Sequence, residues 1–245
     1  MDLPETYKKL VASTFTSDFR KAAEIVEVPF PEPGTGEIVM KNRYAGVNAT
    51  DPNISRGLYS PPGTKPPIDL GSEAVGEVVA VGTGVENFKV GDAMMVLTTG
   101  GGYREFYVTP ADRAIPIPEA TPEIMTLVLS GLTASFGLEI TGEMTSGETI
   151  LITAAAGGTG HIAVQLAKQA GNHVIGTCGT PEKAEFLKSL GCDRVVNYRE
   201  EDLDAVLKAE YPKGVNIVYE SVGRKMFDVA VDHLELVEEL KRYAR

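Results

Sequence analysis

The stretch from Ile150 to Lys168, ILITAAAGGTGHIAVQLAK, joins an apolar run, a turn of small residues and an amphipathic run. Ala155, Gly157 and Gly160 stand at the spacing of the dinucleotide fingerprint G-x-G-x-x-G. Glycines there allow a tight turn, a close approach of pyrophosphate and packing of helix on strand, and the helix start offers N–H groups to an anion. The pattern predicts a phosphate-binding turn, although any tight strand-to-helix turn can look the same.

The next apolar run ends at Cys178 and Gly179. At this place an enzyme that uses the unphosphorylated cofactor carries Asp or Glu for the ribose hydroxyls. Lys183 follows, in position to neutralise a 2′-phosphate, so the sequence favours NADP(H) over NAD(H). The alternative for Lys183 is a solvated helix residue beside Glu182.

Two kinds of segment must position these residues. From Val11 to about Asp112, short alternating runs separated by Gly and Pro predict antiparallel sheet in a barrel. From Glu123 onward, helices alternate with strands, which predicts a parallel sheet with helices on both faces. We place a barrel domain at residues 1–124 and a dinucleotide-binding domain at 125–245. The strands expected in the second domain are Thr149–Ala154, His173–Thr177, Arg194–Asn197 and Val215–Glu220.

Composition limits the partners. The 245 residues carry a formal charge of −11, which disfavours nucleic acid or an anionic membrane as a main partner and favours small molecules. No apolar run approaches the roughly 20 residues that span a bilayer, and the first residues lack the apolar core of a signal peptide. We therefore expect no membrane span and a cytoplasmic location. Cys178 and Cys192 can form a disulfide, but two reduced, buried thiols are the favoured interpretation.

Six motifs in order carry a family resemblance: AGVNATD, LGSEAVGEVVAVGTGVENFKVGD, SGLTA, AAAGGTGHIAVQLAK, GTCGTPEKAEFLKSLGCD and VYESVG. Together they resemble the medium-chain dehydrogenase/reductase superfamily, in its zinc-independent quinone oxidoreductase branch. The resemblance implies an α/β protein with a GroES-like β-barrel domain followed by a Rossmann domain. It also leaves a peroxisomal location open, and a homodimer is a further expectation.

The resemblance implies which residues contact the cofactor. Besides Ala155, Gly157 and Gly160, these are Thr133, Gly158, Thr159, Thr180, Lys183, Tyr198 and Ser221. Tyr198 has the alternative of filling the core. One position departs from the family: Gly179 stands where a serine is common, so binding of the 2′-phosphate would rest more on Lys183 and Thr180.

Residue types argue against zinc. Zinc enzymes of this superfamily use a Cys and a His where this chain has Asn48 and Ser72, and neither supplies the thiolate or imidazole that zinc prefers. All three histidines, His161, His173 and His233, lie in the second half without ligand-like spacing, so surface or packing roles are expected.

Chemistry without a metal favours an activated alkene over an isolated ketone. If hydride adds to the β-carbon of an α,β-unsaturated ketone, charge collects on the enolate oxygen, which hydrogen-bond donors can stabilise. The candidate donors are Asn48 and Tyr59, the latter with the alternative of packing on its neighbouring prolines. Asp51 and Glu73 are interpreted as structural rather than catalytic acids.

Three functions compete. The first is an NADPH-dependent reductase of enones, such as 15-oxo-prostaglandin-like lipids; the second is an NADPH-binding chain with impaired catalysis; the third is a quinone oxidoreductase. The second arises because family members carry further strands of the Rossmann sheet, which we do not find here. Instead Phe227, Val231, Leu234, Val237 and Leu240 recur at helical spacing, with Glu238 placed to pair with Arg242.

Overall fold

A computed structural model describes residues 3–235 of the chain. The chain forms two compact units, Met1–Leu129 and Ser130–Arg245. The sequence-based boundary falls between residues 124 and 125, inside a helical run that begins in the first unit and ends in the second.

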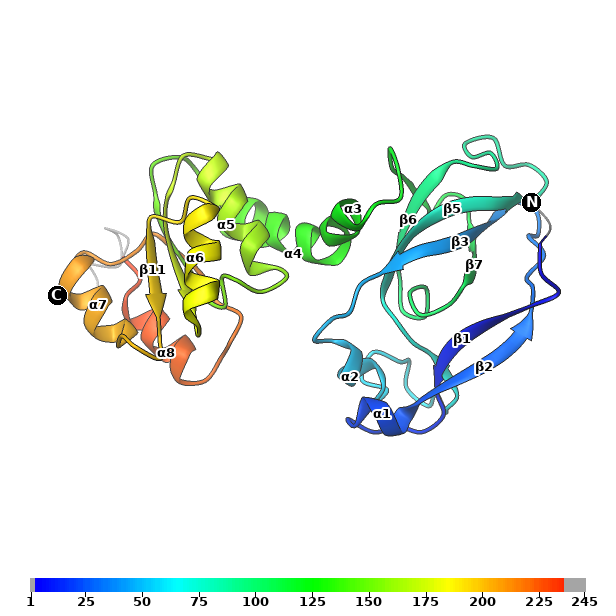
Figure 1. Cartoon of the computed structure of the whole chain (residues 1–245), viewed down its shortest axis with the longest axis horizontal. Coiled ribbons are helices and arrows are strands. Elements are labelled where there is room, and N and C mark those ends of the chain that lie inside the picture. The colour runs from blue at the N-terminus through cyan, green and yellow to red at the C-terminus, as the bar shows by residue number, and fades with distance from the viewer. Residues whose placement is uncertain (1–2, 236–245) are drawn as a thin grey trace. The chain divides into compact units, whose positions relative to one another are not determined.

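The first unit consists mainly of antiparallel sheet, as predicted (Figure 1). A five-stranded sheet has the order β7-β3-β5-β6-β8, and a three-stranded sheet has the order β2-β1-β4. Their bounds are β1 (Thr6–Ala12), β2 (Ala23–Pro29), β3 (Glu37–Ala45), β4 (Ile68–Asp69), β5 (Glu73–Val81), β6 (Ala93–Leu97), β7 (Phe106–Pro110) and β8 (Ile115–Pro116). Alternate residues of β3 and β5, among them Ile38, Met40, Ala74 and Val78, form the core of the larger sheet.

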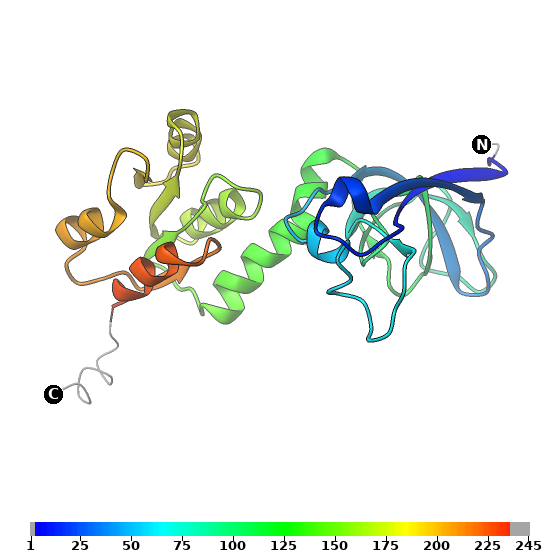
Figure 2. The same ribbon diagram turned by 90° about the horizontal axis from the view of Figure 1, so that it is seen from below.

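Two short helices of this unit, α1 (Phe19–Ala22) and α2 (Asp51–Ile54), lie side by side (Figure 2). Ala22 and Ile54 are buried in one apolar cluster with residues of the three-stranded sheet. Asn48 lies just before α2, and its backbone N–H donates to the side chain of Asp51 in that helix.

The run Pro122–Thr141 is helical throughout, with two π-helical turns. It comprises α3 (Pro122–Thr126), η1 (Leu127–Gly131), α4 (Leu132–Ser135) and η2 (Phe136–Thr141). It is long and apolar enough to cross a membrane by length and composition, which core helices of soluble proteins also satisfy. Met125 and Val128 pack in a core cluster of the first unit, and Ala134 and Leu138 pack in a core cluster of the second.

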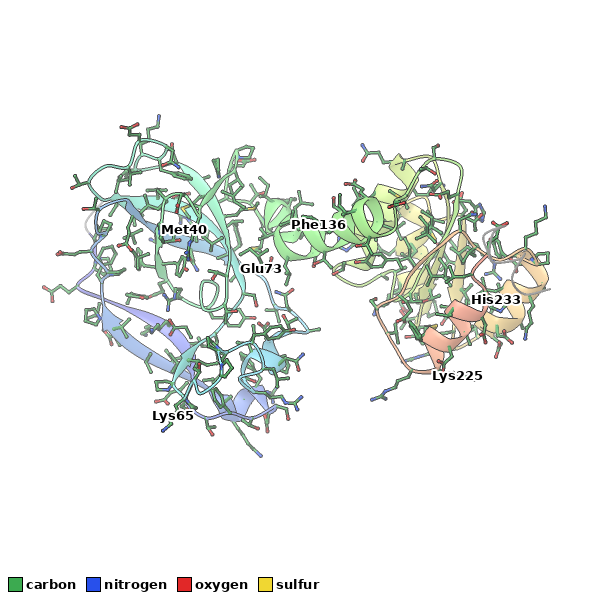
Figure 3. The ribbon with its side chains drawn as sticks, turned by 180° about the vertical axis from the view of Figure 1, so that it is seen from behind. Met40, Lys65, Glu73, Phe136, Lys225 and His233 are labelled. Carbon is green, nitrogen blue, oxygen red and sulfur yellow. The ribbon has the colours of Figure 1, made fainter. Side chains whose placement is uncertain are left out.

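The second unit contains a four-stranded parallel sheet of order β11-β10-β9-β12. Its strands are β9 (Thr149–Ile152), β10 (His173–Cys178), β11 (Arg194–Asn197) and β12 (Ile217–Tyr219); its further helices are α5 (Gly160–Gln169), α6 (Pro181–Ser189), α7 (Leu203–Glu210) and α8 (Lys225–Asp232). Figure 3 labels Lys225 and His233 at the two ends of α8.

Helices cover both faces of this sheet, as predicted. Ile150 and Ile152 of β9 belong to a core cluster with residues of α5 and α6, whereas Leu151 belongs to a cluster with residues of α7 and α8. This alternation follows from the period of two in a strand. The three buried positions of β9, Ile150–Ile152, are therefore all apolar, because each side of the strand meets a helix layer.

The predicted bounds of three strands were wrong. β10 ends at Cys178, one residue later than predicted. β9 ends at Ile152 rather than Ala154, because Ala154 turns the chain with a φ of +46°. β12 contains only Ile217–Tyr219, and Val215 instead forms a single bridge with Leu234. Of the predicted C-terminal helical pattern, Phe227 and Val231 lie in α8, whereas Leu234 follows the end of that helix. Val237, Leu240 and the pair of Glu238 with Arg242 lie outside the described residues.

Candidate functional site

The turn between β9 and α5 is tied to the neighbouring strand. The backbone N–H of Ala155 donates to the carbonyl of Thr177 at 3.0 Å. Gly160 is required by the fold, because a Cβ there would lie 2.4 Å from the carbonyl oxygen of Ala154. The left-handed residue of this turn is Ala154, so the tight turn predicted for the fingerprint begins one position before Ala155.

Gly157 and Gly158 differ from Gly160, because both are exposed. An added Cβ would lie 3.1 Å from the carbonyl oxygen of Ala154 in the first case and 3.3 Å from the Ser130 hydroxyl in the second. Intrachain packing therefore explains the missing side chain less well here than at Gly160. The bare backbone at the start of α5 is suited to an anion instead.

A cavity of about 280 Å³ adjoins this turn at the carboxyl ends of β10 and β11. Its lining consists of Ala154, Ala156, Gly157, Thr177, Cys178, Gly179, Lys183, Tyr198, Val222 and Met226. Lys183 is the charged residue in this lining, and within residues 3–235 it forms no ion pair. A cavity whose lining is uncharged apart from one lysine suits a ligand that carries negative charge.

Tyr198 lies directly over Gly179. A Cβ at position 179 would be 2.5 Å from the phenol oxygen of Tyr198. The Tyr198 side chain is 48% exposed, so the alternative of core filling is wrong. Thr180 caps the start of α6, and its hydroxyl accepts the backbone N–H of Lys183 at 3.3 Å. The pKa of the Glu182 carboxyl is lowered by a hydrogen bond from its own backbone N–H and, to a smaller extent, by one from the Thr180 hydroxyl.

The other predicted cofactor residues do not line this cavity. The Thr159 hydroxyl, at the start of α5, forms no hydrogen bond within the described residues. Ser221 donates its hydroxyl to the carbonyl of Thr153 at 3.4 Å. Thr133 is exposed on α4, where its carbonyl accepts the hydroxyl of Tyr219 at 3.4 Å. Their cofactor roles stay predictions.

Sequence reasoning did not assign a cofactor role to several cavity residues, which include Ala154, Ala156, Thr177, Val222 and Met226. The first three lie in or beside the predicted turn, whereas Val222 and Met226 come from the later part of the chain. Val222 follows β12 in the motif VYESVG, so its place after a parallel strand was a usable signal. Met226 belongs to α8 and had no signal in the sequence.

In the first unit, Asn48 is held by two carboxylates. Its side-chain amide nitrogen donates to Glu73 Oε1 at 2.8 Å, and its backbone N–H donates to Asp51 Oδ2 at 2.8 Å. Glu73 Oε2 accepts the backbone N–H of Leu129 at 2.6 Å, and Asp51 Oδ2 also accepts the hydroxyl of Tyr103 at 2.5 Å. Figure 3 labels Glu73, which begins strand β5.

Burial shapes the acidity of this network. Glu73 is 3% exposed, and this burial is the main cause that raises the pKa of its carboxyl. The hydrogen bonds from Asn48 and Leu129 lower that pKa, whereas the charge of Asp51 raises it. Burial and the bond to Asp51 also raise the pKa of the Tyr103 phenol.

Tyr59 lines a second cavity, of about 370 Å³, within the first unit. The lining comprises Thr50, Ile54, Tyr59, Ser72, Leu97, Thr98, Thr99 and Leu129, and it contains no charged side chain. The Tyr59 side chain is 58% exposed. Asn48 is not part of this lining, so the structure does not join the two predicted catalytic residues in one cavity.

The metal prediction concerns the same unit. In residues 3–235, no group of three or more His, Cys, Asp or Glu side chains is arranged to hold a metal ion. Ser72, at the expected histidine position, has a buried hydroxyl without a partner in the described part of the chain. The absence of zinc therefore rests on residue types.

The cysteines and histidines have local roles. Cys178 and Cys192 are both buried and are not joined by a disulfide. Burial raises the pKa of the Cys192 thiol to about 11. His161 contacts the Gly157 carbonyl at 2.9 Å, His173 contacts the Tyr211 hydroxyl at 2.8 Å, and His233 contacts Asp204 at 2.9 Å.

Comparison with protein families gives two matches. Residues 34–119 match the alcohol dehydrogenase GroES-like domain, and residues 158–236 match the zinc-binding dehydrogenase family. The predicted pair of a GroES-like domain followed by a Rossmann-like domain is thereby confirmed.

Individual relatives agree. The chain is 50% identical to mouse (Mus musculus) prostaglandin reductase-3 over 234 residues, which are 95% of this chain and 62% of the relative. It is 48% identical over 236 residues to a probable quinone oxidoreductase of Leishmania amazonensis, covering 96% of this chain and 69% of the relative. A structure of Escherichia coli quinone oxidoreductase complexed with NADPH superposes with a TM-score of 0.81 at 35% identity, covering 93% and 70% of the two chains. The chain thus spans less than two thirds of the mouse relative.

Proposed function

Because the chain belongs to the medium-chain dehydrogenase/reductase superfamily, we propose that it is an NADP(H)-dependent oxidoreductase that reduces the activated carbon–carbon double bond of an α,β-unsaturated ketone. The observation that carries the proposal is the cavity beside the β9–α5 turn, where bare glycine backbone, a free lysine and a neutral lining occur together.

The residues of this cavity and of the turn beside it fit NADP(H). The backbone N–H of Gly157 is bound to the carbonyl of Ala154 at 2.8 Å, whereas the N–H of Gly158 donates to no backbone carbonyl within residues 3–235 and is open toward a pyrophosphate at the start of α5. The Thr159 hydroxyl adds a donor there. Lys183 is the partner for a 2′-phosphate, because β10 ends at Cys178 and is followed by Gly179 rather than by a carboxylate that would bind ribose hydroxyls. The NADPH-bound quinone oxidoreductase among the similar structures supports the same cofactor.

NADPH, when bound, supplies a hydride. The chain's own contribution is to bind the substrate and to stabilise the charge that forms on its carbonyl oxygen. Asn48 can donate the amide hydrogen that Glu73 does not use, and Tyr59 can donate its exposed hydroxyl. The enolate oxygen therefore needs no Lewis acid, which agrees with Asn48 and Ser72 at the positions that zinc ligands occupy elsewhere in the superfamily.

Product analysis tests the proposal. The chain is incubated with NADPH and a 15-oxo-prostaglandin, beside a fluorescence titration of NADPH alone. We expect a product reduced at the 13,14 double bond. Binding of NADPH without any reduced product would instead identify a cofactor-binding chain with impaired catalysis, and no binding would overturn both parts of the proposal.

Quinone reduction is the second candidate, because relatives named as quinone oxidoreductases match the chain at up to 48% identity. The same incubation with a quinone distinguishes the two: a quinol without alkene reduction favours this candidate. The homodimer and the cytoplasmic location stay predictions, which gel filtration and cell fractionation test.

A further inference from the structure

Glu73 is a buried acidic residue of the first unit, and the proposed reaction gives it no role. Its side chain fills the space over Gly46, where a Cβ would lie only 1.9 Å from Glu73 Oε1. Both carboxylate oxygens accept a hydrogen bond from an N–H group, and Glu73 forms no ion pair within residues 3–235. A buried carboxylate without a cationic partner is costly, so its retention needs a reason.

We infer that Glu73 is a positioning residue that sets the orientation of the Asn48 amide toward the substrate oxygen; this inference rests on the proposed function, in which Asn48 is a donor. An ionised carboxylate only accepts hydrogen bonds, so the NH₂ end of the Asn48 amide must face it. One amide hydrogen is then bound at 2.8 Å, and the direction of the second is fixed by the planar amide.

Two further contacts keep both partners in place. The backbone N–H of Asn48 is held by Asp51, so the main chain of the donor cannot shift freely. The other oxygen of Glu73 is held by the N–H of Leu129, inside the π-helical turn η1. The carboxylate is therefore anchored at one end by backbone and acts on Asn48 at the other.

Glu73→Gln separates this role from simple support. Glutamine has the same shape, and its carbonyl oxygen can still accept the N–H of Leu129. Its own NH₂ group then faces Asn48, whose amide must present its oxygen instead. The packing is retained while the donor moves away from its place.

The test is a double-mutant cycle of Asn48→Ala, Glu73→Gln and the double variant, with Glu77→Gln as the matched control. Glu77 lies on the same strand, but it is half-exposed and pairs with Arg43. We expect Glu73→Gln to lower kcat by about 10- to 100-fold with little change in KM for NADPH, since one oriented donor to a forming oxyanion is lost. The double variant should be no slower than Asn48→Ala alone. Fully additive losses, or an unchanged kcat in Glu73→Gln, would overturn the inference.

A second measurement does not depend on turnover. In a ¹H–¹⁵N spectrum, the side-chain amide signals that vanish in Asn48→Ala should shift in Glu73→Gln and stay in place in Glu77→Gln. If the wild type forms no product but these signals shift as expected, the proposed function fails and the positioning contact stands. If they do not move in Glu73→Gln, the positioning role is refuted whatever the activity.

Discussion

Replacing Lys183 with glutamine removes a cation that has no ion-pair partner in residues 3–235, and we expect this change to weaken NADPH binding without affecting NADH. Lys183 is exposed at the cavity edge, so its interaction with a phosphate is weaker than a buried charge-assisted hydrogen bond. A bond of this kind to the doubly charged 2′-phosphate is worth about 1–2 kcal/mol. Since 1.4 kcal/mol is tenfold in affinity, Kd for NADPH should rise roughly 5- to 30-fold.

The assay is a fluorescence titration of each variant with NADPH and with NADH at fixed ionic strength. Lys188→Gln is the control, because Lys188 lies on the same helix, is exposed and already binds Glu185 at 2.7 Å. It should bind both cofactors like the wild type. Equal weakening of NADPH and NADH in Lys183→Gln, or equal losses in both variants, would refute a 2′-phosphate contact.

Three further outcomes are expected. Gly158→Ala should keep the melting temperature but weaken NADPH binding, whereas Gly160→Ala should cost about 1–3 kcal/mol of stability through overpacking; thermal melts beside titrations distinguish them. Gly179→Ser should weaken NADPH binding by pushing Tyr198 aside, and a gain in affinity would contradict this. As pH falls through the raised pKa of Glu73, its carboxyl gains a hydrogen and no longer only accepts hydrogen bonds. The value of kcat should therefore fall at low pH, with an apparent pKa above the ordinary 4.5. Glu73→Gln should not show this fall.

The fall in kcat at low pH can be distinguished from acid unfolding, because protonation of Glu73 lowers kcat but does not lower the stability of the folded chain. A carboxyl whose pKa is raised in the folded state holds its proton more tightly there than in the unfolded chain. Its contribution to stability is therefore greatest at low pH and is lost as pH rises through the folded pKa. Circular dichroism across the same range should show no loss of structure that tracks the fall in kcat.

The sequence predicted the parallel sheet well, because every strand of it is a local apolar run and every helix has its own capping residue or apolar face. The conformation of the turn into α5 was harder to predict from the sequence. Ala154 adopts a left-handed conformation that costs an alanine roughly 1–2 kcal/mol, and nothing in the sequence marks an alanine for such a place. The contact of Asn48 with Glu73 was also missed, because it joins residues from two separate segments.

The departure at position 179 shows how such distant contacts alter an interpretation. From the sequence, glycine in place of serine is the loss of one hydroxyl from the phosphate pocket. In the structure, the space that a side chain at 179 would fill holds the phenol oxygen of Tyr198, which comes from the end of the neighbouring strand β11. The cavity edge therefore keeps a hydroxyl at this place, supplied by a different strand. Glycine at 179 and tyrosine at 198 are thus one coupled feature, because a side chain at 179 would displace the Tyr198 hydroxyl from this place.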